Sequence, residues 1–280
     1  MPAAAQNPIA SAGLATLEVS LVAGRSAVTS AYAANPMKLL TPIARGPGVW
    51  ACTSSFGGGL VAGDRTRLEL SVGPNACCFL GTQASTKIYR NAGLRASGHH
   101  TLATLGEQAR LIFAPEPVQP FTQSSYEQRQ EFRLAAGAGL ALVDWFSAGR
   151  VARGERWAFQ RFHGRNEVFL SGERIFLDAL ALDAATGSLG APHVTGRFNC
   201  FALLLLAGEP MRPAAADLLA EYAAWPVARG AKLLATASPL AHGAVLRLAG
   251  EDLEAVGREL HRQLGFTAAW LGDNPWARKF

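Results

Sequence analysis

Short stretches of alternating apolar and polar side chains run through most of the chain and predict strands. In residues 66–72, Leu68, Leu70 and Val72 would share one face, with polar side chains on the other. Similar stretches, or short apolar runs bounded by Gly and Pro, predict strands at residues 14–22, 49–53, 76–80, 99–105, 109–113, 126–134, 139–146, 164–170, 174–182 and 198–206. Pro36 marks an extended or edge segment. The nearly all-apolar run 198–206 predicts a central strand.

Turn signals suggest how some of these strands connect. Gly73, Pro74 and Asn75 separate residues 66–72 from 76–80 and predict a hairpin. Gly106 predicts a second hairpin between residues 99–105 and 109–113. The sequence therefore favours a mainly β fold.

Helical patterns come late in the chain. Pro213 precedes a predicted helix at residues 214–224, and Leu253, Val256 and Leu260 have helical spacing within residues 251–264. We expect two or three helices, mostly C-terminal. Residues 1–13 are predicted to be a flexible leader, and residues 14–280 a single β domain with a C-terminal helical flank, because we find no repeat period or composition break.

Composition excludes several classes of protein. Hydrophobic residues make up 49% of the 280 and charged residues 17%, which is typical of a globular chain. The net charge of +5 comes mostly from scattered Arg, which we interpret as contact surface and not as a nucleic-acid site. No basic residue precedes Arg25, and the longest apolar run, 201–207, is too short to span a membrane, so we expect a cytoplasmic protein. The cysteines lack metal-binding spacing and are expected to be buried and reduced: Cys52, Cys77, Cys78 and Cys200.

A glycine-rich block at residues 56–64 is the most distinctive stretch. Its glycines permit positive φ angles or close approach of another backbone. The block is not a phosphate loop, because no Lys-Ser or Lys-Thr pair follows it, and a strand follows where a dinucleotide fold needs a helix. Two interpretations stay open: a turn capped by Asp64, or a carboxylate presented in a narrow, backbone-lined passage. The glycines are Gly57, Gly58, Gly59 and Gly63.

A second charged cluster begins within an apolar strand and continues past its end. Asp144 lies within that strand, and a buried carboxylate needs compensation, so an Arg a few residues on, Arg150 or Arg153, is the expected partner in an internal ion pair. The alternative is that the cluster, which includes Glu155, lines a polar channel. His99 and His100 would diverge on a strand and are expected to be surface histidines. No nucleophile–base pair is evident, and we predict that the protein is not an enzyme.

Five motifs in order resemble the urease accessory protein UreD (UreH) family: residues 57–64, 82–90, 115–121, 149–157 and 177–180. The resemblance implies a spiralling two-layer, β-helix-like body. It also implies a non-enzymatic scaffold that binds apo-urease and recruits UreF and the GTPase UreG for nickel delivery. No tightly bound cofactor is implied, only transient Ni²⁺, and no nucleic-acid or membrane partner. A dimeric arrangement within the assembly is left open.

The resemblance also nominates site residues. Asp64 matches the acid that closes the glycine motif and is predicted to line a nickel passage as a transient ligand, with Asp144, Glu155 and Asp178 as further candidates. A His-Pro pair found before the glycine motif in many members is replaced here by residues 53–56. The alternative function is a purely structural adaptor that bridges urease and UreF without handling nickel. Further motif positions are Gly57, Gly58, Gly59, Gly63, Thr86, Lys87, Tyr89 and Arg150.

Overall fold

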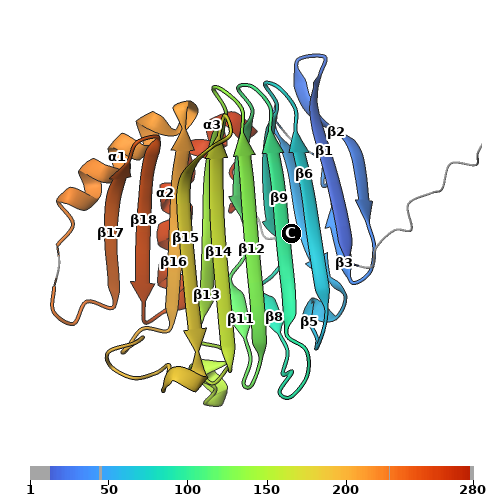
Figure 1. The fold of residues 1–280 in the computed structure, drawn as a ribbon. Helices are drawn as coiled ribbons and strands as arrows, with labels where there is room; N and C mark the ends of the chain where they lie inside the picture. The colour runs from blue at the N-terminus through green and yellow to red at the C-terminus, as the bar shows by residue number, and fades with distance from the viewer. Residues whose placement is uncertain (1–12, 44–45, 227, 278–280) are drawn as a thin grey trace, which may run out of the picture.

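Two stacked β-sheets form the body of the protein in the computed structural model, which describes residues 13–43, 46–226 and 228–277 (Figure 1). The seven-stranded sheet has the order β15 (Glu173–Asp183), β14 (Arg161–Leu170), β12 (Ser125–Leu134), β9 (Ser97–Leu105), β6 (Arg65–Val72), β1 (Leu14–Val22) and β2 (Arg25–Ala33). The eleven-stranded sheet has the order β17 (Leu233–Leu240), β18 (Gly243–Gly250), β16 (Cys200–Gly208), β13 (Gly139–Ser147), β10 (Arg110–Ala114), β7 (Cys77–Thr82), β4 (Val49–Ser55) and β3 (Met37–Leu40). Its remaining strands are β5 (Gly59–Leu60), β8 (Thr86–Ile88) and β11 (Val118–Pro120).

The chain crosses repeatedly from one sheet to the other, so successive coils stack side by side. β6, β9, β12 and β14 are parallel neighbours in one sheet, and β4, β7, β10 and β13 are parallel neighbours in the other. The colours of Figure 1 accordingly advance from one edge of the sheets to the other. This confirms the predicted spiralling, β-helix-like body. The edge position of β3, after Pro36, and the internal position of β16 are also confirmed.

Both predicted hairpins are wrong. β6 and β7 belong to different sheets, as do β9 and β10, so the turns between them are corners of the coil. A positive-φ residue followed by a fully buried alanine occupies each corner: Asn75 and Ala76 in the first, Gln108 and Ala109 in the second. A turn signal specifies a change of direction, not the pairing partner, and each strand pairs with its counterpart in the next coil.

Among the described residues, three α-helices cover the outer face of the eleven-stranded sheet: α1 (Arg212–Ala223), α2 (Leu253–Gln263) and α3 (Ala268–Leu271). Pro213 lies in the first turn of α1, as predicted, and Asp252 caps α2 by accepting a hydrogen bond from the Glu254 N–H at 3.0 Å. The sheet is therefore apolar on both faces, which explains the continuous apolar runs of β13 and β16. The helices are C-terminal, as predicted.

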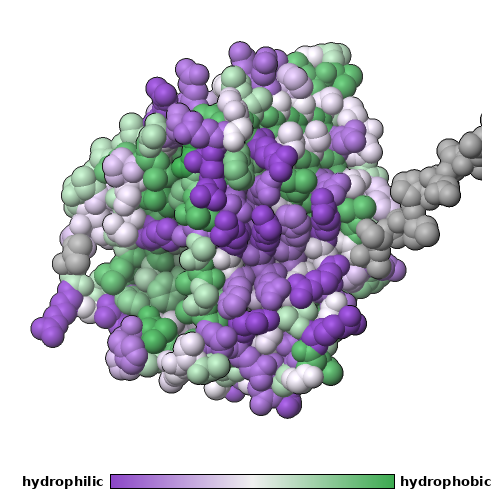
Figure 2. All heavy atoms as spheres, in the orientation of Figure 1, coloured by the Kyte–Doolittle hydropathy of each residue, from purple (hydrophilic) through white to green (hydrophobic). Residues whose placement is uncertain are grey.

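The outer face of the seven-stranded sheet is open and charged. Its strands alternate: the inward side chains of β6 are buried, and the outward Arg67 and Glu69 form an ion pair at 2.6 Å. Figure 2 shows hydrophilic side chains gathered across the middle of this face. On β14, Glu167 accepts hydrogen bonds from Nε and Nη2 of Arg165, each at 2.8 Å. These hydrogen bonds lower the pKa of the Glu167 carboxyl to about 2. Polar outward and apolar inward positions are what fix the strand register.

Other predictions concern the ends and the thiols. The leader predicted for residues 1–13 lies, except for Gly13, outside the described residues. Among the helices that the structure describes, none is long and apolar enough to cross a membrane. The four cysteines are buried and form no disulfide, which confirms their predicted burial. Burial also raises the pKa of the Cys52 thiol to about 11.

Candidate functional site

A band of polar side chains crosses the interior between the two sheets. On each strand it occupies the inward positions, in phase with apolar residues: Thr66 precedes Leu68 on β6, and Gln128 and Gln130 precede Phe132 on β12. Apolar clusters lie on both sides of the band, one near Leu70 and Phe132 and one near Tyr126 and Phe162. We call this set the polar band: Thr66, His99, Thr101, Gln128, Gln130, Asp144 and Asn166.

His99 belongs to this interior, so its prediction as a surface histidine is wrong. Its Nδ1 lies 2.8 Å from the Thr66 hydroxyl and its Nε2 lies 3.1 Å from the Thr101 hydroxyl. Burial and the neighbouring His100 lower the pKa of His99 to about 4, which keeps the imidazole neutral near pH 7. His100, on the opposite face of β9, is the outward member of the pair.

Asp144 presents its carboxylate to the band from the opposite sheet. Oδ1 accepts from Gln128 Nε2 at 2.8 Å, and Oδ2 accepts from Asn166 Nδ2 at 2.7 Å. Burial raises the pKa of this carboxyl, and the two amide hydrogen bonds oppose that rise. The predicted ion pair between Asp144 and an Arg a few residues on is wrong: in the described part of the chain the donors to Asp144 are these two amides, and Arg150 pairs with Glu155.

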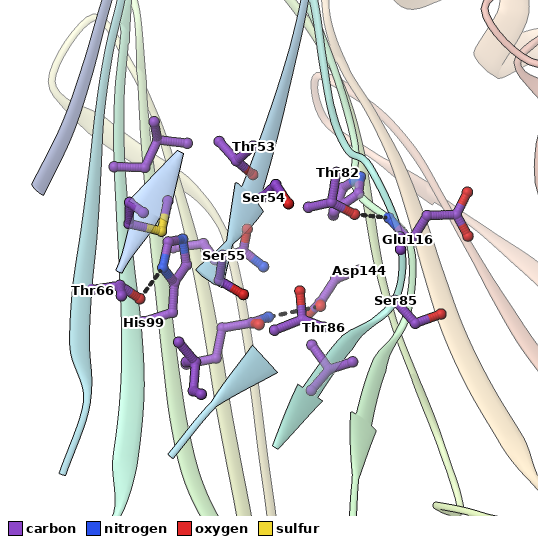
Figure 3. Close-up of a pocket in the computed structure, with 18 of the residues that line it drawn as sticks. Thr53, Ser54, Ser55, Thr66, Thr82, Ser85, Thr86, His99, Glu116 and Asp144 are labelled. Carbon is purple, nitrogen blue, oxygen red and sulfur yellow. Dashed lines mark hydrogen bonds between the residues drawn. The ribbon is translucent and has the colours of Figure 1, made fainter. Parts of the chain in front are cut away.

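Two cavities meet at Asp144. The first, which we call the hydroxyl cavity, has a volume of about 90 Å³ and includes Glu116 and His99 in its lining. Figure 3 shows hydroxyl side chains around the same space as His99 and Asp144. The second, which we call the Asp178 cavity, has a volume of about 300 Å³ and is lined by Asp178, Arg247, Thr195 and apolar side chains. Asp144 lines both. The hydroxyl groups of the first cavity come from Thr53, Ser54, Ser55, Thr66, Thr82, Ser85, Thr86 and Tyr126.

The glycine motif forms the turn and short strand beside the hydroxyl cavity. Gly57, Gly58 and Gly63 have φ angles of 72°, 69° and 80°, which favour glycine. β5 pairs with β8 at Gly59 and Lys87, and a Cβ on Gly59 would lie 2.2 Å from the Lys87 carbonyl oxygen. The motif therefore needs glycine for both turn conformation and close strand approach.

Asp64 closes this turn. Its Oδ2 accepts a hydrogen bond from the Val61 N–H at 2.9 Å, which is the capping arrangement considered from the sequence. Asp64 is partly exposed and is not among the described residues that line the hydroxyl cavity or the Asp178 cavity. Its assignment as a nickel ligand stays a prediction.

Motifs that are far apart in sequence converge beside this turn. The Tyr89 hydroxyl donates to the Gly57 carbonyl oxygen at 2.7 Å, and its ring meets Phe121 edge-on at 5.4 Å. The Arg150 guanidinium lies over the other motif aromatic, Phe121, at 4.1 Å. Its hydrogen bond to Glu155 lowers the pKa of that carboxyl. Four of the five motifs thus build one corner of the fold, which we call the motif corner. It lies next to Thr86, which lines the hydroxyl cavity.

The fifth motif, residues 177–180, lies at the Asp178 cavity. Asp178 pairs with Arg247 at 2.6 Å and lines the Asp178 cavity. Of the four predicted acids, the structure brings Asp144 and Asp178 to one cavity, whereas Glu155 joins Arg150 in the motif corner. Sequence reasoning missed Gln128, Gln130 and Asn166, although each interrupts the apolar phase of a strand, and that interruption was the available signal.

The chemistry of the site is that of neutral oxygen donors and a few carboxylates. Within the described part of the chain, no group of three or more His, Cys, Asp or Glu side chains could hold a metal ion. Hydroxyls, amides and isolated carboxylates suit a hard or hydrated cation held weakly, in contrast to a closed thiolate or imidazole site.

Comparison with known proteins identifies the family to which the chain belongs. The family model for the UreD urease accessory protein matches residues 11–279. The chain belongs to the UreD family. It is 44% identical over 270 residues to the urease accessory protein UreD of Sorangium cellulosum (strain So ce56), covering 96% of this chain and 85% of that protein. Identity is 40% over 270 residues to the UreD of Anaeromyxobacter sp. (strain Fw109-5), covering 95% and 89%.

The family extends to plants. The chain is 29% identical over 288 residues to the urease accessory protein D of Arabidopsis thaliana, covering 92% of this chain and 98% of that protein. The resemblance inferred from the five motifs is confirmed. Membership of the UreD family supports a role in urease maturation.

Proposed function

We propose that this UreD-family protein is a non-catalytic scaffold for urease maturation that binds apo-urease, recruits UreF and UreG, and passes nickel toward the urease active site. The observation that carries the proposal is the polar band, with Asp144 where its two cavities meet. Nickel is cargo here and not a resident cofactor.

The physical chemistry of the band supports weak, transient contact with a cation. Its amides and hydroxyls offer oxygen atoms without charge, and His99 is neutral near pH 7, so the band does not repel a divalent ion. Asp144 adds a carboxyl group between the cavities, and a divalent cation would stabilise its ionised form. Arg247 balances the second carboxylate, Asp178. A hydrated ion would therefore be attracted to the junction without being trapped by a complete ligand set.

The test is reconstitution with apo-urease, UreF and UreG, followed by measurement of nickel bound to urease and of urease activity. We expect Asp144→Asn to assemble the complex normally but to reduce nickel loading about tenfold or more, because the carboxylate at the junction is neutralised. Asp217→Asn, on a surface helix, is the matched control and should be silent. Failure of the unmodified chain to bind apo-urease or UreF would refute the scaffold role.

A structural adaptor is the second candidate. Its support is the motif corner, where Tyr89, Phe121, Arg150 and Glu155 interlock and contribute none of their side chains to the two cavities. If the protein only bridges urease and UreF, the double variant Asp144→Asn with Asp178→Asn should support full nickel loading. Asp64→Ala in the same assay tests whether the acid of the glycine motif takes part.

A further inference from the structure

Asp144 is a carboxylate in the interior without a positive partner. Within the described part of the chain no Arg or Lys forms an ion pair with it, and its two hydrogen-bond donors are neutral amides. The nearby carboxylate of Asp178 is already paired with Arg247. A buried carboxyl without a counter-charge is costly to ionise, and a cation bound at the junction would offset that cost.

The two amides that hold Asp144 differ in what else they contact. Gln128 uses both ends of its amide, because Nε2 donates to Asp144 and Oε1 accepts from the Tyr126 hydroxyl at 3.3 Å. Asn166 uses only one end. Its side chain is 1% exposed, and among the described residues no donor reaches its Oδ1. Gln128 is therefore fixed from both sides, whereas Asn166 can rotate without breaking a hydrogen bond at its oxygen.

We propose that Asn166 is a second, oxygen ligand for a divalent cation at Asp144. With no cation present, the Asn166 N–H donates to the Asp144 carboxyl group. When a cation reaches Asp144, the amide rotates by about half a turn about its terminal torsion, which is soft for Asn, and Oδ1 takes the place of the N–H. The cation then stabilises the ionised form of the carboxyl, and the Asn166 oxygen gains a partner.

This site is suited to a cation that must leave again. Asp144 and Asn166 supply two oxygen atoms, one charged and one neutral, and water from the adjoining Asp178 cavity completes the coordination. The inference rests on the proposed function only for the identity of the ion as nickel. The binding site itself is a property of the isolated chain.

The first measurement is Ni²⁺ binding to the isolated full-length protein by isothermal titration calorimetry. If Asn166 is a ligand, Asn166→Leu should weaken Ni²⁺ binding by about tenfold. If Asn166 is only a donor that restrains Asp144, its removal frees the carboxylate, and affinity should stay the same or increase. The sign of the change thus separates the two roles. Thr104→Val, which removes an exposed hydroxyl on the outer face of β9, away from the polar band, is the control and should leave affinity unchanged.

A second measurement keeps the proposal testable if Asn166→Leu fails to fold. Crystals of the unmodified protein soaked in Ni²⁺ should show an anomalous scattering peak between the Asp144 carboxylate and the Asn166 amide. A peak elsewhere, or no peak at a concentration that gives binding in solution, would overturn the assignment. Nickel bound at this site by a chain that does not activate urease would refute the proposed function and leave the site standing.

Discussion

At the scale of single residues, the interior of this UreD-family protein carries polar side chains where strand alternation calls for apolar ones. His99 is an example: it shares its inward phase with Ala103 and Leu105, and two threonine hydroxyls satisfy both of its ring nitrogens. Such residues cost stability unless they are hydrogen-bonded, so their presence in the core indicates a role beyond packing.

His99 should make stability depend on pH in mildly acidic solution. Its pKa is lowered from 6.5 to about 4 in the native protein, so between these values the unfolded chain binds a proton that the native chain does not. Stability should therefore fall as the pH drops from 7 to 4, by up to about 3 kcal/mol from this residue. Urea unfolding of the wild type and of His99→Gln across this range measures the difference. Parallel pH profiles for the two proteins would contradict the expectation.

At the scale of elements, the sequence predicted which segments are strands better than which strands pair. Alternation in residues 66–72 gave β6 and its buried face correctly, because one face of that sheet is open to solvent. The corner at Asn75 looked like a hairpin turn, since local residues set the bend and the stacking of distant coils sets the pairing. The short strands β5, β8 and β11 carry too few residues for any period to be read.

The pairing of β5 with β8 supplies a test of the glycine motif as an element. Gly59 has an extended φ of 177°, so its requirement for glycine comes from contact with the Lys87 backbone and not from conformation. Gly59→Ala should separate the two strands and lower the free energy of unfolding by about 1–3 kcal/mol. Gly265→Ala, at a position with open space around it, should be neutral. Equal urea midpoints for both variants would show that β5 and β8 move apart without cost.

At the scale of the whole molecule, the fold places the polar band inside a body whose two sheets are otherwise joined by apolar packing. The five motifs identified the family, and Asp144 and Asp178, two of the acids nominated from the sequence, line cavities inside the fold. Their place in a nickel passage stays a prediction. The polar band itself was not predicted from the sequence. Its members come from β6, β9, β12, β13 and β14, and only the coil brings their inward positions into register.

Gly164 provides a way to fill the space beside the polar band without changing a charged residue. It occupies an inward position on β14 and lines the Asp178 cavity, and a Cβ there would meet Phe162 Cε1 at 3.4 Å, an ordinary contact. Gly164→Leu should place its side chain in the cavity next to Asp144 and obstruct movement of a hydrated ion. We expect apo-urease and UreF to bind normally while nickel loading of urease falls about tenfold. Gly164→Ala should load nickel normally. If Gly164→Leu also loads nickel at the wild-type rate, the ion does not travel through the interior, and the adaptor role becomes the better account of the fold.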